Sequence, residues 1–130
     1  MILLDTCVLI FDALTPERLS ETARNALDQG EADRTLACCD ISLWEIAMLV
    51  EKGRLHPGTD SATFTRLALD ARGIRVLEIT PEIARMSAQI DLPHADPADR
   101  LISATAIQHA ALLVTIDHRL RESILVKTLW

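Results

Sequence analysis

The chain has 130 residues, of which 49% are hydrophobic and 25% are charged, and its net charge is −6. This length and composition exclude a disordered chain and predict one domain, residues 1–130, with a buried core. The acidic balance argues against a broad basic surface for nucleic acid, and an aromatic content of 3% predicts no aromatic platforms for stacking bases.

The cysteines and the apolar segments indicate a cytoplasmic protein. Three cysteines are present, two of them adjacent at Cys38 and Cys39, and their spacing is not that of a metal site. An odd number of thiols without such spacing is typical of reduced cysteines in the cytosol. No stretch approaches the roughly 18 uninterrupted apolar residues of a membrane span, and no basic segment precedes a signal core. We therefore expect a cytoplasmic domain without membrane contact.

Short apolar runs alternate with amphipathic segments along the chain, which predicts alternating strands and helices. Ile2–Leu4 is a continuous apolar run, as in a strand that is buried on both faces. Thr15 and Pro16 are typical of a helix start, and Gly30 and Gly73 are expected to end helices. The predicted elements are, in chain order, a strand at Ile2–Leu4, a helix after Asp5, helix 15–30, strand 35–39, helix 42–53, helix 60–73, strand 74–79, helix 80–90, helix 96–111, strand 112–115 and strand 124–129.

Apolar residues at helical spacing predict which helix faces are buried. Strands that alternate with helices imply a mostly parallel sheet with right-handed crossovers. We therefore predict an α/β sandwich with a central sheet of four to five strands, in which 124–129 is an edge strand. The predicted inward residues of the helices are Leu19, Ala23, Ala26, Leu27, Leu43, Ile46, Ala47, Val50, Phe64, Leu67, Ala68, Ala71, Ile83, Met86 and Ile90.

Five acidic residues lie where these elements begin or end. In open α/β sheets, ligands bind beyond the carboxyl ends of the strands, so most of these acids should share one edge. Each also has a purely structural explanation, because Asp is a favoured helix cap and Ser42-x-x-Glu45 has the pattern of a capping box. The five acids are Asp5, Glu45, Asp96, Asp99 and Asp117.

Carboxylates that are crowded together repel one another and need a compensating charge. Arg100 is the one basic residue directly adjacent to an acid of this set. A hard divalent cation supplies the missing charge, and carboxylates with water are the ligands that Mg²⁺ or Mn²⁺ accepts. The histidines are scattered, with His94 alone close in sequence to the acids, so a zinc site is not indicated.

Four segments of the chain together resemble a PIN-domain protein, specifically a VapC-type toxin ribonuclease of a bacterial type II toxin–antitoxin module. They are LLDTCVLI, SLWEIAML, HADPADRLISATA and LVTIDHRL, and they cover essentially the whole chain in the order and spacing of the family. Ala98 departs from the bulky aromatic residue that relatives often carry, which concerns packing rather than chemistry. The resemblance implies a PIN-like α/β/α sandwich.

The resemblance also implies the residues of the site. It gives Asp5, Glu45, Asp99 and Asp117 as the acidic quartet that holds Mg²⁺ or Mn²⁺ and serves catalysis. Asp96 is an accessory candidate that caps the helix or assists the quartet. Thr6 and Thr115 carry small hydroxyl groups suited to hydrogen bonds with those acids.

The implied activity is metal-dependent hydrolysis of RNA phosphodiester bonds. Arg100, Arg119 or Arg121 could hold the RNA backbone, and the alternative is that these arginines are solvated surface residues.

The implied partners are an antitoxin and a second copy of the chain. A VapB-type antitoxin is expected to place an Arg or Lys among the carboxylates and to contact apolar residues around Phe11, Leu14 and Leu19. A homodimer is also expected, because homodimers are the commonest assembly and PIN toxins usually form them.

Two other kinds of protein share some of these features. A receiver-type signalling domain also places acids above a sheet, but it needs paired acids after its first strand and a lysine after a late strand. Here Asp5 stands alone, and Lys127 lies within predicted strand 124–129. A catalytically silent PIN module that binds RNA or protein would be expected to have lost acids, and this chain retains all four of the quartet.

Overall fold

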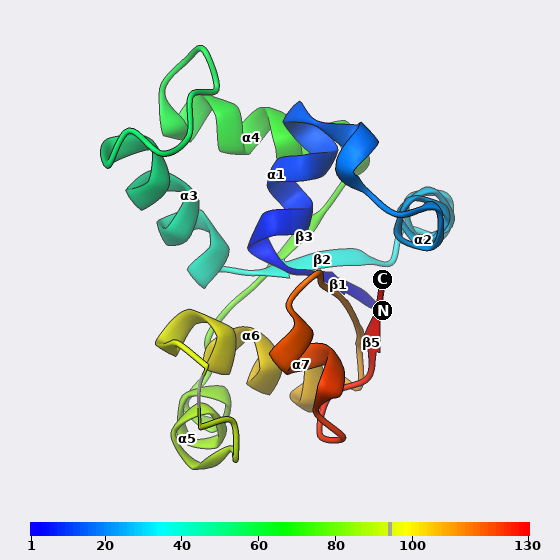
Figure 1. Cartoon of the computed structure of the whole chain (residues 1–130), viewed down its shortest axis with the longest axis vertical. Coiled ribbons are helices and arrows are strands. Elements are labelled where there is room, and N and C mark those ends of the chain that lie inside the picture. The colour runs from blue at the N-terminus through cyan, green and yellow to red at the C-terminus, as the bar shows by residue number, and fades with distance from the viewer. Residues whose placement is uncertain (94) are drawn as a thin grey trace.

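Five parallel strands form the centre of the molecule, a computed structural model that describes residues 1–93 and 95–130. The strand order β3-β2-β1-β4-β5 puts the first strand in the middle of the sheet, and helices cover both faces (Figure 1). The prediction of a mostly parallel α/β sheet is confirmed. The strands are β1 (Ile2–Leu4), β2 (Leu36–Cys39), β3 (Arg75–Leu77), β4 (Leu112–Val114) and β5 (Thr128–Leu129).

The helices divide between the two faces of the sheet. In Figure 1, α1, α3 and α4 lie on one side of the strands, and α5, α6 and α7 lie on the other. Within the described residues, no helix is both long and apolar enough to span a membrane. The helices are α1 (Thr6–Leu14), α2 (Glu21–Asp33), α3 (Ile41–Glu51), α4 (Ser61–Arg72), α5 (Pro81–Gln89), α6 (Pro97–Gln108) and α7 (His118–Glu122).

Side chains that alternate along the strands supply two hydrophobic cores, one on each face. Leu4 points into the core that α1 and α2 cover, whereas its neighbour Leu3 points into the core beneath α6. Both residues are fully buried. The continuous apolar run of β1 is therefore explained by burial on both faces.

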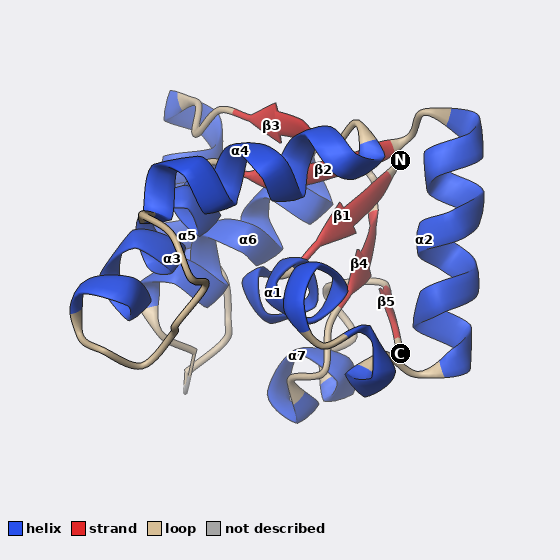
Figure 2. Cartoon of the chain, turned by 90° about the horizontal axis from the view of Figure 1, so that it is seen from above, coloured by secondary structure: helices blue, strands red, loops and turns tan. Residues whose placement is uncertain are grey.

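Three helix starts and one helix end agree with the predictions from local patterns. Asp60, Thr80 and Asp96 each cap a helix as expected, and Gly73 ends α4 in the left-handed conformation. Figure 2 views these helices from above the sheet.

The predicted helix 15–30 is wrong at both ends. Pro16–Arg18 forms a 3₁₀ turn, and α2 begins after Ser20, whose hydroxyl accepts from the amide of Ala23. Gly30 lies inside α2 rather than at its end. A Cβ at this position would lie 2.4 Å from Cδ2 of Leu36. This glycine is required by close packing on β2, not by helix termination.

Other parts of the chain also differ from the predictions. Leu67 and Ala71 are predicted to face inward, but both are exposed on α4, Leu67 to 63%. Predicted strand 124–129 shrinks to Thr128–Leu129, although it is the edge strand as expected. Helix α7 was not predicted, because five residues are too few to show helical periodicity. His94, which opens the HADPADR segment, lies outside the described residues.

Candidate active site

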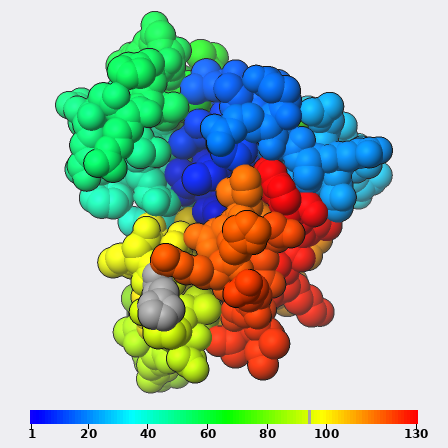
Figure 3. All heavy atoms as spheres, viewed as in Figure 1, coloured from blue at the N-terminus to red at the C-terminus, as the bar shows by residue number. Residues whose placement is uncertain are grey.

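The parallel sheet brings the predicted acids to one edge. Asp5 follows β1 directly, and Asp117 follows the neighbouring strand β4 by a short turn. Glu45 lies in α3 and Asp99 in the first turn of α6, the helices that begin beside the same edge. Figure 3 shows these four distant parts of the sequence meeting on one face, as dark blue, cyan-green, yellow and orange atoms.

Asp5 is held in place by both of its carboxylate oxygens. Oδ1 accepts from the backbone amide of Thr6 at 2.8 Å, which is the helix cap that the sequence predicted. Oδ2 accepts from the hydroxyl of Thr115 at 2.6 Å. Asp5 is only 6% exposed. It therefore serves both as the cap of α1 and as a buried carboxylate of the candidate site.

Glu45 is not part of a capping box, and that expectation is wrong. Oε1 accepts a hydrogen bond from the hydroxyl of Thr6 at 2.5 Å, and Ser42 Oγ lies 2.8 Å from the same hydroxyl. Asp40, not Ser42, precedes α3, and it makes no side-chain cap. Glu45 is therefore tied to the first turn of α1, across the site, rather than to its own helix.

Asp117 and Asp96 both cap helices. Oδ1 of Asp117 accepts from the amides of Arg119 and Leu120 at the start of α7, and the amide of Asp117 donates to Thr115 Oγ1. Oδ1 of Asp96 accepts from the amide of Asp99 at 2.8 Å. Asp96 is exposed, which fits the expected role of positioning α6.

The acids repel one another across the site. Burial, followed by the charges of Asp96, Asp5, Asp117 and Glu45, raises the pKa of Asp99 to about 7. Burial also raises the pKa of Asp5, against the hydrogen bonds from Thr115 and Thr6, and Asp117 adds to the rise. The pKa of Glu45 is raised by burial as well, and further by Asp5. Ionising all four groups therefore requires a compensating positive charge.

The oxygen-only donor set and its mutual repulsion fit a hard divalent cation. The described side chains do not already form a ready-made cluster of three or more His, Cys, Asp or Glu ligands. Asp5, Glu45 and Asp117 instead accept the hydrogen bonds given above, and Asp99 interacts with the other acids through electrostatic repulsion. Asp5, Asp99, Asp117 and Glu45 are the residues that would hold Mg²⁺ or Mn²⁺.

The arginines named as candidate RNA contacts have different environments. The guanidinium of Arg100 donates to the carbonyl oxygens of Ser87, Ile90 and Leu92, so it fixes the connection between α5 and α6. This structural role explains Arg100 without RNA. Arg119 and Arg121 both project from α7 and are exposed.

The apolar surface expected around Phe11, Leu14 and Leu19 is only partly on the surface. Phe11 is 8% and Leu19 is 5% exposed, so both belong to the core. Leu14 is 39% exposed and lines a groove of about 550 Å³ between α1 and α4, together with Leu67. We call this the α1–α4 groove.

One arginine closes the end of the α1–α4 groove. Arg72 forms a bidentate pair with Asp12 at 2.7 and 2.8 Å and also contacts Asp28 and Glu31 at 2.9 Å. These ion pairs join α4 to α1 and α2. Because the pair with Asp12 is largely buried, removing either partner would leave an uncompensated charge.

Two residues near the site were missed in the sequence. Ser42 holds the Thr6 hydroxyl that serves Glu45, and its position in an apparent capping box concealed this. Burial and the charges of Asp5, Glu45, Asp99 and Asp117 raise the pKa of the Cys7 thiol to about 11. Its place two residues after Asp5 was the signal that could have located Cys7 at the site.

Known proteins resemble the chain along nearly its whole length. A family model described as PIN domain matches residues 2–123. Ribonuclease VapC22 of Mycobacterium tuberculosis is 37% identical over 123 residues, which are 92% of this chain and 89% of that protein.

Solved structures have the same fold. VapBC2 from Rickettsia felis, bound to a DNA fragment from its promoter, aligns with a TM-score of 0.76 at 18% identity, over 99% of this chain and 98% of that one. FitAcB from Neisseria gonorrhoeae aligns with a TM-score of 0.68 at 27% identity, over 98% and 96% of the two chains.

Proposed function

The chain belongs to the PIN-domain family and to its VapC-type members, and we propose that it is a metal-dependent endoribonuclease that acts as the toxin of a toxin–antitoxin pair. One observation supports this most strongly. Carboxylates from four separate segments lie at one edge of the sheet, and burial, followed by the charges of these neighbouring acids, raises the pKa of Asp99 to about 7. A structural cap does not require this crowding, whereas a cation site does.

The side chains around the site account for its geometry. Thr115 and Thr6 hold Asp5 and Glu45 by hydroxyl groups that donate, which leaves lone pairs of both carboxylates available to a ligand. Asp117 and Asp99 are fixed by the helix starts on which they lie. Bound Mg²⁺ or Mn²⁺ would supply the charge that activates water and stabilises the in-line displacement at phosphorus. An ionised carboxylate of the quartet would orient the attacking water and accept its proton.

The proposed partner is a VapB-type antitoxin. The VapBC2 and FitAcB structures have this fold. The α1–α4 groove exposes Leu14 and Leu67, which suits an apolar helix face of a partner. An arginine or lysine from the same partner would neutralise the quartet in place of the metal. We also expect a homodimer and a cytoplasmic location, as inferred from the sequence.

The test is cleavage of RNA by the purified chain. We expect endonucleolytic products in Mg²⁺ or Mn²⁺, none with chelator, and a loss of about 100-fold or more in Asp99→Asn. Asp70→Asn, an exposed acid on α4, is the matched control and should be fully active. Full cleavage by Asp99→Asn would overturn the assignment of the site. A catalytically silent RNA-binding module would instead bind RNA without cutting it, with or without metal.

A further inference from the structure

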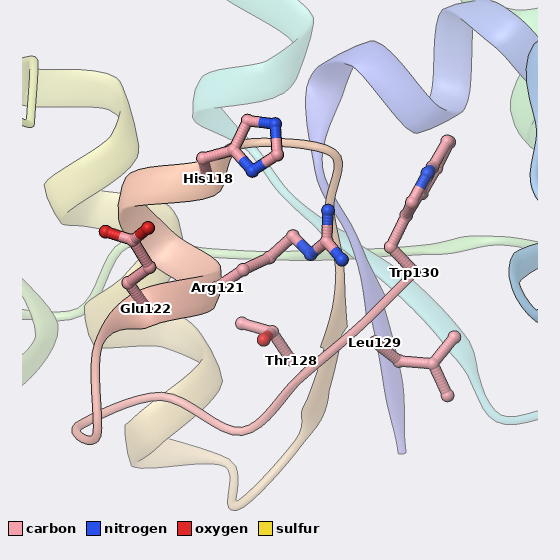
Figure 4. Close-up of a pocket in the computed structure, with 6 residues that line it drawn as sticks. All are labelled: His118, Arg121, Glu122, Thr128, Leu129 and Trp130. Atoms are coloured by element: carbon pink, nitrogen blue, oxygen red, sulfur yellow. The ribbon is translucent and has the colours of Figure 1, made fainter.

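A second hollow of about 540 Å³ lies between α7, the helix that follows Asp117, and β5. Its lining combines an aromatic side chain, two basic ones, an acid, a hydroxyl and an aliphatic side chain, drawn in Figure 4. The Arg121 side chain extends from α7 toward Trp130, with His118 on the same side, whereas Glu122 points away from them (Figure 4). The lining residues are His118, Arg121, Glu122, Thr128, Leu129 and Trp130. We call this hollow the α7–β5 pocket.

The strand register fixes how close this pocket is to the quartet. Leu129 pairs with Val114, so Trp130 follows at the level of Thr115 on the next strand, about 4.8 Å away across the sheet. The amide of Thr115 donates to the carbonyl of Leu129, and its hydroxyl donates to Asp5. Trp130 therefore comes off the same carboxyl edge of the sheet as Asp5 and Asp117.

Helix α7 supplies the other wall from the same edge. His118 is the residue directly after Asp117, and Arg121 lies three residues farther on, hence on the same side of the helix. Both residues are exposed, and in the described part of the chain the guanidinium of Arg121 forms no ion pair or side-chain hydrogen bond. Arg72 and Arg100, in contrast, are fully engaged by protein oxygens.

We propose that the α7–β5 pocket binds a nucleotide of single-stranded RNA that flanks the bond held at the quartet, with its base stacked on Trp130 and its phosphate on Arg121 and His118. The inference rests on the proposed function and names a substrate subsite for it. An indole face accepts any base, and a guanidinium that is not already paired is suited to a phosphate. A low aromatic content predicted no stacking platform, but the fold places one of the two tryptophans, partly buried, in the wall of this pocket.

The pocket fits RNA better than a protein segment. An antitoxin helix needs an extended apolar face, whereas this hollow presents one indole and one leucine among polar groups. The net charge of −6 also disfavours non-specific binding of RNA. Binding of the RNA phosphate backbone must therefore come from local basic side chains such as Arg121.

The experiment uses Trp130 as its own reporter. Trp44→Phe leaves Trp130 as the single tryptophan of the full chain, and adding Asp99→Asn prevents cleavage during the titration. Octamers of adenylate and of uridylate RNA are added in Mg²⁺, and quenching of the indole fluorescence is measured over a range of salt concentrations. The same RNAs are then tested on Arg121→Gln, with Arg66→Gln on α4 as the matched exposed arginine.

We expect the octamers to quench Trp130. Arg121→Gln should weaken binding and lower the salt dependence by about 0.7 in the slope of log K against log salt, whereas Arg66→Gln changes neither. In the cleaving background, Trp130→Ala should raise KM at least about tenfold with kcat and the metal-induced rise in melting temperature unchanged.

Other outcomes separate the subsite from the proposed activity. RNA cleavage with unchanged KM in Trp130→Ala and Arg121→Gln overturns the subsite and leaves the nuclease intact. Quenching that depends on Arg121 without cleavage by the parent chain supports the subsite and overturns the nuclease. No binding and no cleavage overturns both. If the two substitutions weaken capture of an antitoxin instead of RNA, the pocket is a protein contact and the inference is wrong.

Discussion

The hydroxyl of Thr6 donates a 2.5 Å hydrogen bond to Oε1 of Glu45, and this bond joins the first turn of α1 to α3 across the candidate site. The two residues are 39 positions apart in the sequence. The backbone amide of Thr6 also donates a hydrogen bond to Asp5, so this one residue positions two carboxylates of the quartet, those of Asp5 and Glu45. The predictions below follow from this arrangement and from the repulsion within it.

Glu45→Gln should reduce RNA cleavage about 100-fold with little effect on stability. The amide oxygen of glutamine still accepts from Thr6, but the negative charge needed for the cation is lost. Burial and Asp5 raise the pKa of Glu45, so a neutral residue relieves repulsion, and the free energy of unfolding should change by less than about 1 kcal/mol. Cleavage kinetics and denaturant unfolding measure the two effects. Glu51→Gln, at the end of the same helix, is the control, and normal activity in Glu45→Gln would return Glu45 to a structural role.

Asp5→Asn should abolish cleavage while the fold persists. The substitution is nearly isosteric: the asparagine oxygen still accepts from the Thr6 amide, and its NH2 group donates to the Thr115 hydroxyl, which then accepts instead of donating. Thr115→Val, which removes one of these supports, should cost roughly 10–100-fold in activity or metal affinity. Circular dichroism and cleavage rates check both variants. An Asp5→Asn protein that is unfolded would show that the residue acts mainly as the cap of α1.

Mg²⁺ or Mn²⁺ should stabilise the folded chain. A ligand that binds only the folded state adds about 2.7 kcal/mol at a hundredfold excess over its Kd. The rise in melting temperature should vanish in Asp99→Asn and persist in Asp70→Asn, an acid outside the site. A wild-type melting temperature that does not respond to millimolar Mn²⁺ would contradict a metal site at the quartet.

The metal-free protein should lose stability as the pH rises from about 4 to about 7. Burial and the neighbouring acids raise the pKa of Asp99 from 3.8 to about 7. In that window the folded state retains a proton that the unfolded chain has released, so the free energy of unfolding falls with increasing pH. Denaturant unfolding in chelator at several pH values should give a flatter profile for Asp99→Asn. Parallel profiles for the two proteins would show that Asp99 is not the group responsible.

Expression of the chain alone should slow bacterial growth, and Asp5→Asn should remove the effect. Co-expression with the antitoxin should restore growth, because its basic residue would neutralise the quartet. Leu67→Glu, on the exposed side of the α1–α4 groove, should weaken that rescue without changing RNA cleavage by the purified chain. If the chain is harmless in cells yet cleaves RNA well, the toxin role is wrong and the nuclease role remains.

Local patterns in the sequence determined the fold class and most of the acids. The apolar run of β1, the caps at Asp60, Thr80 and Asp96, and Gly73 all act over a few residues, so neighbouring letters suffice to predict them. The carboxyl ends of parallel strands lie at one edge of the sheet, where ligands of open α/β folds bind. This rule depends only on the strands being parallel, and it indicated that Asp5 and Asp117 share one edge.

Only the tertiary structure decided which partner each side chain contacts. Ser42 and Glu45 fit a capping box by spacing, but Thr6 from a distant segment engages both. Gly30 reads as a helix stop, yet the side chain of Leu36 on β2 is what excludes a Cβ there. Trp130 is brought to the same carboxyl edge of the sheet as Asp5 and Asp117 through the pairing of β5 with β4, a contact between strands that no local pattern encodes. Sequence neighbours determine helices and caps, whereas hydrogen bonds and packing between distant segments determine the site.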